Sequence, residues 1–205
     1  MTVKTNKSIA FSGTCYWCMQ AMFASLKGVK KATQGWMQTE PTRLKHPNQP
    51  SIHQGINHAN ISDASSDSQD FVEAVVIEYD ESQISLDVLI AIHLHTHNPN
   101  KTHRLLQRYP SVIYLSEQSD IKRAELMLRP HQQEFAARGE TLSTQVKPFT
   151  QFEPSPAEQQ DYYYQNPQKP FCQVRITPKL SQLMQNYRQY LDDDKAKIIS
   201  QNTFD

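Results

Sequence analysis

The sequence predicts an α+β domain in which helices cover one face of a mixed or antiparallel β-sheet. Two observations lead to this prediction. The expected elements twice follow the order strand, helix, strand, which is typical of a sheet with helices on one side. In addition, residues 71–79 (FVEAVVIEY) form a run rich in β-branched residues, as expected of a central strand.

The first strand and helix are predicted on either side of a short turn. Residues 9–11 are a short apolar strand, and residues 12–14 (SGT) form a turn in which Thr14 is a suitable N-cap. A helix then begins at Cys15, and Gly28 is expected to end it. The apolar residues that recur at helical spacing are Met19, Met22, Phe23 and Leu26.

The second unit is interrupted by a long polar segment. Residues 29–37 predict a strand, and residues 38–69 are rich in Pro, Asn, His and Ser without a clear period, so we expect an insertion loop there. The central strand 71–79 follows. A helix over residues 86–97 has one apolar face and is stopped by Asn98-Pro99.

The rest of the chain predicts shorter elements. These are strands over 111–115 and 142–149, and helices over 117–138, 156–164 and 178–192. Pro130 falls inside the helix predicted over residues 117–138, where we expect a break or kink. Together these elements fit one domain over residues 1–205, with a C-terminal extension from about residue 166.

The composition restricts the classes of partner. The chain has 205 residues with 21 basic and 21 acidic side chains, so its formal net charge is zero, and we expect neither nucleic acid nor a membrane as a partner. No apolar run approaches the ~20 residues that span a bilayer. The N-terminal MTVKTNKS lacks the apolar core of a secretory signal. We therefore expect the cytoplasm as the location, and a monomer is the expectation for the oligomeric state.

Cys15 is the first candidate for chemistry. A cysteine in the first turn of a helix lies beside unpaired backbone N–H groups, which stabilise an anion, so we expect a lowered pKa and a reactive thiolate. The alternative is that Cys15 is only a small buried apolar residue. Cys18 completes a Cys-x-x-Cys pair, and the three cysteines are an odd number, which argues against a purely structural disulfide framework.

The segment GTCYWCMQAMFASLKGV resembles the signature of the type A peptide methionine sulfoxide reductases (MsrA). That signature is Gly-Cys-Phe-Trp-(Gly or Cys)-x-Glu, followed by an apolar helix ending in Gly-Val. Further similar segments follow in the family's order, at 73–80, 97–99, 109–114, 149–152, 160–167 and 170–180. The resemblance implies a two-layer α/β sandwich with a ferredoxin-like core.

The implied activity is the reduction of methionine-S-sulfoxide, free or in proteins, to methionine. A thiolate attacks the sulfoxide sulfur, an acid protonates the oxygen, and the cysteine is left as a sulfenic acid. A second thiol condenses with it to a disulfide, which thioredoxin or another external dithiol reduces. No bound cofactor and no metal are implied.

The resemblance assigns roles to five residues. Cys15 matches the nucleophile, and Tyr16 and Trp17 match the aromatic wall that holds the substrate methyl group. Glu73 matches the acid–base carboxylate, and burial would suit it to donate a proton near neutrality. On the sequence alone, a surface residue of an alternating strand is the favoured interpretation of Glu73, since carboxylates are seldom buried, and the resemblance reverses that preference. Tyr109 matches a tyrosine whose hydroxyl binds the sulfoxide oxygen.

Two cysteines could resolve the sulfenic acid. Cys18 lies in the same helix as Cys15, whereas Cys172 matches a C-terminal cysteine of the family in a proline-flanked loop. We favour Cys172, because a helix can hinder closure between Cys15 and Cys18, and Cys18 could be packed instead.

The chain also departs from the family pattern. Thr14 replaces a glycine, Gln20 a glutamate and Gln159 a histidine, and the tyrosine-rich segment before the central strand has no counterpart. The family's loop before Tyr109 is shortened and lacks its substrate-binding aspartate. About half of the binding shell is therefore altered.

Three alternatives remain open at this stage. A thioredoxin-like dithiol oxidoreductase would also use Cys15 and Cys18, although Tyr-Trp between them is unusual and no matching proline loop is evident. A metal site could combine the three cysteines with a histidine, although a lone Cys-x-x-Cys is weak support. The altered shell also fits a non-enzymatic binding module. The histidines at 93, 95, 97 and 103 are expected to mark a polar helix end.

Overall fold

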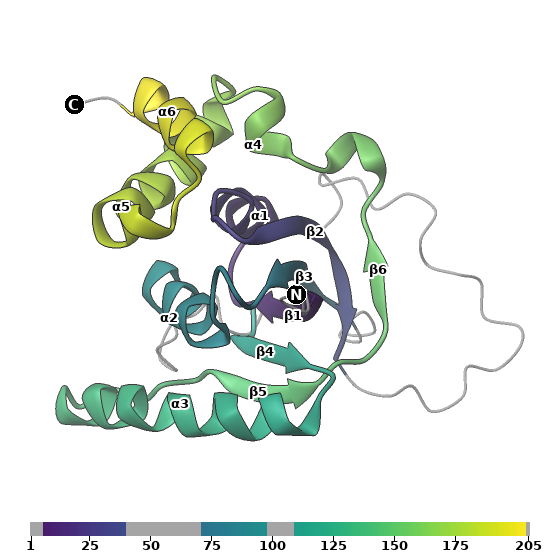
Figure 1. Ribbon diagram of the computed structural model, residues 1–205, viewed down its shortest axis with the longest axis vertical. Helices are drawn as coiled ribbons and strands as arrows, with labels where there is room; N and C mark the ends of the chain where they lie inside the picture. Colours follow the sequence, from purple (N-terminus) through teal and green to yellow (C-terminus); the bar gives the residue numbers. More distant parts are fainter. Residues whose placement is uncertain (1–5, 40–70, 98–108, 204–205) are drawn as a thin grey trace, which may run out of the picture.

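The structure is a computed structural model that describes residues 6–39, 71–97 and 109–203 of the chain. Six strands form one sheet in the order β5-β4-β1-β3-β2-β6 (Figure 1). Their bounds are β1 Asn6–Ser12, β2 Val29–Gln38, β3 Phe71–Asp80, β4 Val112–Leu115, β5 Gln145–Pro148 and β6 Phe152–Pro154. Only β4 and β5 pair in parallel, so the sheet is mixed, as the sequence predicts.

The centre of the sheet has ferredoxin-like topology. The chain runs β1, α1 (Tyr16–Ala24), β2, β3, α2 (Leu86–Thr96), β4, and the four strands lie side by side as β4-β1-β3-β2. This is the split β-α-β arrangement in which every neighbouring pair is antiparallel. Ser85 caps α2, because its side chain accepts a hydrogen bond from the backbone N–H of Val88.

The remaining helices follow β4 in the chain. Their bounds are α3 Gln118–Ala137, η3 Ala157–Gln159, α4 Tyr162–Gln165, η4 Cys172–Ile176, α5 Thr177–Tyr187, η5 Arg188–Tyr190 and α6 Asp193–Asn202. In Figure 1 the yellow helices α5 and α6 lie beyond α1, at the upper left, while β6 lies at the right-hand edge of the sheet. The segment η4 is a π-helix that continues into α5.

Alternation along β3 separates the two faces of the sheet. Val75, Ile77 and Tyr79 are fully buried and belong to the large apolar core that the helices complete. Val72 and Ala74 point to the other face, where they join a small separate cluster. The helices whose buried residues are described all pack into the larger core, which confirms the expectation of helices on one face.

The C-terminal segment is tied to the end of α1. The backbone N–H of Asp192 donates to the carbonyl of Ser25 at 2.8 Å, and that of Lys27 donates to the carbonyl of Tyr190 at 2.7 Å. These bonds hold η5 and the start of α6 against the first helix, and thereby close the core above α1.

Several sequence expectations need correction. Helix α3 runs through Pro130 as one element, with no break there. Helix α1 ends at Ala24, so Gly28 lies in the following turn, at φ +82°, and does not cap the helix. The predicted strand 142–149 shortens to β5, and neither β6 nor α6 was expected. The predicted insertion at 38–69 begins beyond the end of β2, and positions 40–69 of it lie outside the described residues.

No helix in the described ranges is both long enough and apolar enough to cross a bilayer.

Gly35 allows β6 to approach β2 closely. A Cβ atom at this position would lie 2.2 Å from the carbonyl oxygen of Glu153 and 2.8 Å from the Cα of Pro154, both backbone atoms that cannot rotate away. We therefore expect Gly35→Ala to destabilise the protein by about 3 kcal/mol, the upper end of the range for overpacking. The measurement is the urea midpoint of unfolding.

The matched control for Gly35→Ala is Lys31→Ala, an exposed position on the same strand. Surface changes of this kind usually stay within about 0.5 kcal/mol. Equal midpoints for Gly35→Ala and the wild type would show that β6 does not press against Gly35.

Candidate active site

Cys15 lies at the turn between β1 and α1, where it is the N-cap residue of the helix. The preceding Gly13 has φ +146°, a conformation that side-chain-bearing residues rarely adopt, and it lets the chain reverse directly after the strand. The Cys15 thiol is half-buried. The sequence expectation of a cysteine at a strand-to-helix turn is therefore correct, although the cap is Cys15 itself and not Thr14.

Glu73 points from β3 toward the start of α1. Its side chain is on the same face of the sheet as Val75, and the residue is only 7% exposed. Carboxylate Oε2 accepts a hydrogen bond from the backbone N–H of Tyr16, at 3.0 Å. The carboxylate thus occupies the N-terminus of α1, next to the nucleophile candidate, where the helix dipole favours an anion.

Tyr109 completes the polar part of the site. Its hydroxyl points at the second oxygen of Glu73, Oε1, with a long contact of 3.5 Å. The two carboxylate oxygens therefore face different partners, the helix N-terminus on one side and the Tyr109 hydroxyl on the other. The structure brings Cys15, Glu73 and Tyr109 together from three separate segments of the chain.

Aromatic rings surround the helix start. Tyr16 is buried, and Trp17 stacks on Tyr162 with ring centroids 4.2 Å apart and planes at 11°. Phe171 meets the Trp17 ring edge-on, at 5.5 Å. These contacts fix Trp17 between α1 and the segments that follow β6.

Trp36 is a site residue that the sequence analysis missed. It lies directly opposite Glu73 in the pairing of β2 with β3, so the two side chains point to the same face of the sheet. Its ring meets Tyr16 edge-on, at 5.7 Å between centroids. The register between the two strands brings Trp36 beside Glu73. In the sequence, a long polar segment separates the two residues.

The two candidate resolving cysteines occupy different places. The Cys18 side chain is buried, lies in hydrogen-bond contact with the Cys15 thiol, and approaches the Arg175 carbonyl at 3.9 Å. Cys172 is fully buried at the start of η4. Its thiol lies near enough to Cys18 for the charge of one to affect the other.

The pKa of the Cys15 thiol is raised, which corrects the expectation of a lowered value. The hydrogen bond with Cys18 is the largest cause, followed by burial and by the negative charges of Cys18 and Glu73, while the Cys18 backbone N–H acts in the opposite direction. The N-terminus of α1 does not offset these effects, because the Tyr16 N–H donates to Glu73 and not to the thiol. In the resting state Cys15 is therefore a thiol.

Cys18 shows the opposite direction. Its pKa is lowered, first by the hydrogen bond with Cys15, against the effect of burial, and further by the positive charges of Lys179 and Arg175. Lys179 itself has a lowered pKa because of burial, and its Nζ donates to the carbonyl of Thr96 at the end of α2. The positive charge of the C-terminal segment thus acts mainly on Cys18.

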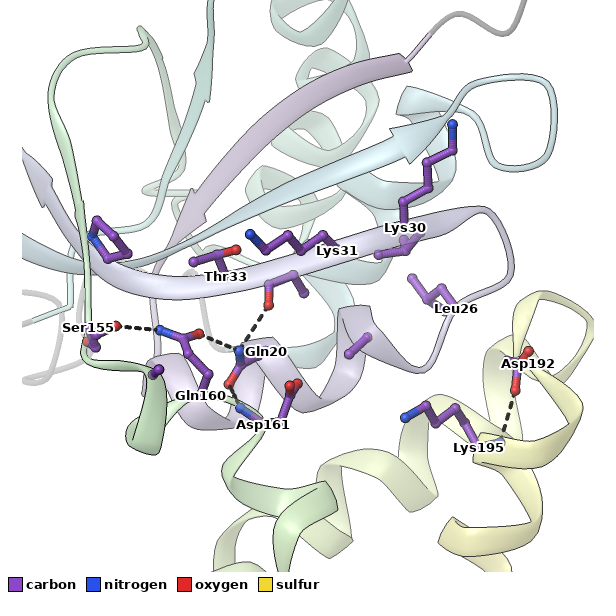
Figure 2. Close-up of a pocket in the computed structure, with 15 residues that line it drawn as sticks. Gln20, Leu26, Lys30, Lys31, Thr33, Ser155, Gln160, Asp161, Asp192 and Lys195 are labelled. Carbon is purple, nitrogen blue, oxygen red and sulfur yellow. Dashed lines mark hydrogen bonds between the residues drawn. The ribbon is translucent and has the colours of Figure 1, made fainter.

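Gln20 joins α1 to β2 and to the segment between η3 and α4. Its amide nitrogen donates to the Ala32 carbonyl at 2.9 Å and to Gln160 Oε1 at 2.7 Å, and its oxygen accepts from the backbone N–H of Asp161. Figure 2 shows these bonds at the wall of a cavity of about 560 Å³. The residues lining this cavity include none of the three cysteines, so it is separate from the thiol site.

The histidines on α2 do not form a polar helix end, which corrects another expectation. His93 and His97 are buried and stack on each other with centroids 4.1 Å apart. His93 also stacks on Phe11 of β1, at 4.4 Å. Only His95 is exposed, and His103 lies outside the described residues.

The alternative of a metal site has no geometric support among residues 6–39, 71–97 and 109–203. Within those ranges no group of three or more His, Cys, Asp and Glu side chains is arranged to hold an ion.

Comparison with known proteins gives a consistent result. A family model described as peptide methionine sulfoxide reductase matches residues 7–191. The peptide methionine sulfoxide reductase MsrA of Psychrobacter sp. is 29% identical over 193 residues, which cover 90% of this chain and 98% of that protein. The MsrA of Acinetobacter baumannii (strain SDF) is 28% identical over 188 residues, covering 89% and 97%.

Two solved structures share the fold. Methionine sulfoxide reductase A of Corynebacterium diphtheriae superposes with a TM-score of 0.62 at 19% identity, covering 81% of this chain and 77% of that one. Reduced Mxr1 of Saccharomyces cerevisiae superposes with a TM-score of 0.61 at 19% identity, covering 80% and 87%.

Proposed function

The chain belongs to the peptide methionine sulfoxide reductase family, and on this basis we propose that it reduces methionine-S-sulfoxide, free or in proteins, to methionine. The observation that carries the proposal is the position of the Glu73 carboxylate. It lies between the N-terminus of the helix that Cys15 begins and the Tyr109 hydroxyl. A nucleophile, an acid and a hydroxyl donor thus converge, as sulfoxide reduction requires.

The first chemical step balances with these groups. The Cys15 sulfur attacks the sulfoxide sulfur, the S–O oxygen is transferred to Cys15, and methionine leaves, so that one thiol and one sulfoxide become one sulfenic acid and one thioether. Cys15 loses a proton as it attacks, and the oxygen gains one. Glu73 can take the first proton and deliver the second, because it is buried beside the helix that Cys15 begins.

The electrostatics of the pair support this order of events. The negative charge of Glu73 is one of the causes that raise the pKa of Cys15. When Glu73 accepts a proton, that charge disappears and the Cys15 thiolate becomes easier to form. Proton transfer to Glu73 therefore prepares the acid and the nucleophile at the same time.

The aromatic residues are proposed to bind the methyl group of the substrate. Tyr16 and Trp17 flank the helix start, and Trp36 adds a third ring beside Glu73. Aromatic rings favour contact with thioether-like groups. Tyr109 is proposed to hold the sulfoxide oxygen through its hydroxyl, which already points at Glu73.

We propose Cys18 as the resolving cysteine, in place of the Cys172 that the sequence favours. The contact between the Cys15 and Cys18 thiols and the lowered pKa of Cys18 support this assignment. The Cys18 sulfur would attack the sulfur of the Cys15 sulfenic acid, the S–O bond would break, and the departing hydroxyl would take up the proton that the Cys18 thiol gives up, so that a disulfide forms and water is released. An external dithiol such as thioredoxin would then reduce the disulfide, in a monomeric enzyme working in the cytoplasm.

The resolving step gives a testable difference between two matched variants. With a thioredoxin system as reductant, we expect Cys18→Ser to lower steady-state turnover by about a hundredfold, because an intramolecular thiol has a large proximity advantage. Cys172→Ser should keep most of the activity. Mass spectrometry of the oxidised wild type should find a Cys15–Cys18 disulfide. The reverse ranking of the two variants, or a Cys15–Cys172 disulfide, would contradict the assignment.

Turnover itself separates the reductase from the two other functions. The assay follows loss of methionine-S-sulfoxide, beside the R epimer, with dithiothreitol as reductant. Reduction of the S epimer alone is expected. A thioredoxin-like oxidoreductase would reduce disulfides without consuming either epimer, and a binding module would consume nothing.

A further inference from the structure

We propose that His97 is a positioning residue, which fixes the segment carrying Tyr109 against the turn that carries Cys15. The inference rests on the proposed function, because it concerns the alignment of the hydroxyl donor with the nucleophile. His97 is the first residue after α2, and its side chain contacts Gly13 and Ser111, which lie two residues from Cys15 and Tyr109, respectively. Its proposed effect is therefore indirect.

The first contact of His97 is with the turn that carries Cys15. A Cβ atom on Gly13 would lie 2.9 Å from His97 Cδ2 and 3.0 Å from His97 Nε2, so the imidazole packs directly against the Cα of Gly13. Gly13 is two residues before Cys15. His93 lies beneath the same turn, because its Cε1 would be 3.4 Å from that Cβ. The stacked imidazoles thus form a rigid support under the turn.

The second contact is with the segment that follows Tyr109. His97 Nε2 lies 2.7 Å from the hydroxyl of Ser111, and that hydroxyl lies 2.8 Å from Thr144 Oγ1. His97 Nδ1 faces the carbonyl oxygen of His93, which can only accept, so Nδ1 carries the proton of a neutral ring. Nε2 is then an acceptor, Ser111 donates to it, and Thr144 donates to Ser111.

A further hydrogen bond joins the end of β1, next to the turn that carries Cys15, to the segment that follows Tyr109. The Ser12 hydroxyl, at the end of β1, donates to the carbonyl of Pro110 at 2.7 Å. Pro110 is therefore held from one side by the residue before Gly13, and Ser111 from the other side by His97. Tyr109 directly precedes this fixed pair, so its direction toward Glu73 depends on both anchors.

Burial keeps the imidazole in the form that can accept. Burial lowers the pKa of His97 to about 4, an effect that the Lys179 charge reinforces and the His93 carbonyl opposes. The pKa of His93 is also lowered, again chiefly because of burial. The neutral ring, and with it the bond from Ser111, is therefore stable at neutral pH.

The test is a double-mutant cycle with kcat/KM for methionine-S-sulfoxide as the readout. In the wild-type background, His97→Leu is expected to lower kcat/KM by about tenfold or more, as small misplacements at reacting centres do. In a Tyr109→Phe background, where the hydroxyl is absent, His97→Leu should lower kcat/KM by less than about twofold. A residue that only stabilises the fold would have the same effect in both backgrounds.

Three further variants support the cycle. His97→Gln retains an acceptor for Ser111 and is expected to restore most of the activity. Ser111→Ala is the milder variant if His97→Leu fails to fold, and it should show the same dependence on Tyr109. His95→Leu is the matched control, because His95 lies on the same helix and its ring contacts Tyr187 on the outer face.

The outcomes separate this inference from the proposed function. Turnover by the wild type with additive effects of His97→Leu and Tyr109→Phe would overturn the positioning role alone. Equal losses for His95→Leu and His97→Leu would overturn it as well. Absence of turnover by a folded wild type would overturn the proposed function, and the positioning role with it.

Discussion

Cys15→Ser is expected to abolish the reduction of methionine-S-sulfoxide, with kcat/KM falling by at least about 10⁴-fold. A serine hydroxyl is a far weaker nucleophile than a thiol. It also cannot take up the sulfoxide oxygen, because the product would be a hydroperoxide instead of a sulfenic acid. The neighbouring Cys18 is not expected to substitute, since it is buried whereas Cys15 is partly exposed.

The measurement compares the wild type, Cys15→Ser and Cys172→Ser at equal concentration, with dithiothreitol as reductant and each epimer supplied separately. Cys172→Ser is the matched control, because it removes a thiol of the same chain without changing the proposed nucleophile. Cys15→Ser should unfold at a urea concentration close to that of the wild type, whereas Cys172→Ser should unfold at a lower one, because it places a hydroxyl at a fully buried position. Substantial turnover by Cys15→Ser would show that another group attacks the sulfoxide.

The central part of the fold was predictable because its signals are local. The β-branched run of β3 and the spaced apolar residues of α1 and α2 each lie within a single element. These patterns identify the strands and helices of the ferredoxin-like core. They do not reveal β6, since three residues of an edge strand carry no pattern of their own.

The site was predictable only where a motif names its residues. Cys15, Tyr16 and Trp17 are adjacent in the sequence, whereas Trp36 joins them through the register of β2 with β3. A long connection separates the two strands in the sequence, so no short segment of the sequence indicates their register. Trp36 is therefore a consequence of tertiary pairing.

The direction of the Cys15 pKa illustrates the same limit. The rule that a helix N-terminus stabilises an anion holds here, but the anion that receives the Tyr16 N–H is Glu73. Glu73 lies 57 positions along the chain from Tyr16, so no local pattern could indicate the competition. The hydrogen bond with Cys18 and burial raise the pKa of Cys15, and the charge of the Glu73 carboxylate adds to this effect.

The presence of Glu73 at the N-terminus of α1 beside Cys15 leads to a second prediction. The variant Glu73→Gln should slow the reduction of the sulfoxide and speed the alkylation of Cys15. Glu73→Gln keeps the size of the side chain and an oxygen that can accept from the Tyr16 N–H, but it cannot donate a proton to the substrate oxygen. We expect kcat to fall by about 10²–10⁴-fold, the usual contribution of a general acid or base. KM should change much less, because the variant leaves in place the aromatic residues that are proposed to bind the substrate methyl group.

Alkylation of Cys15 by iodoacetamide should respond in the other direction. Removing the negative charge of Glu73 removes one cause of the raised pKa of Cys15, so a larger fraction of the thiol is ionised at a given pH and alkylation becomes faster. Glu78→Gln is the matched control, because Glu78 is an exposed residue of the same strand and should leave both rates unchanged. If Glu73→Gln slowed reduction and alkylation alike, the loss would reflect a disturbed Cys15. Slower reduction with faster alkylation is the expected result, because the variant loses the proton that Glu73 delivers to the substrate oxygen while the Cys15 thiolate becomes easier to form.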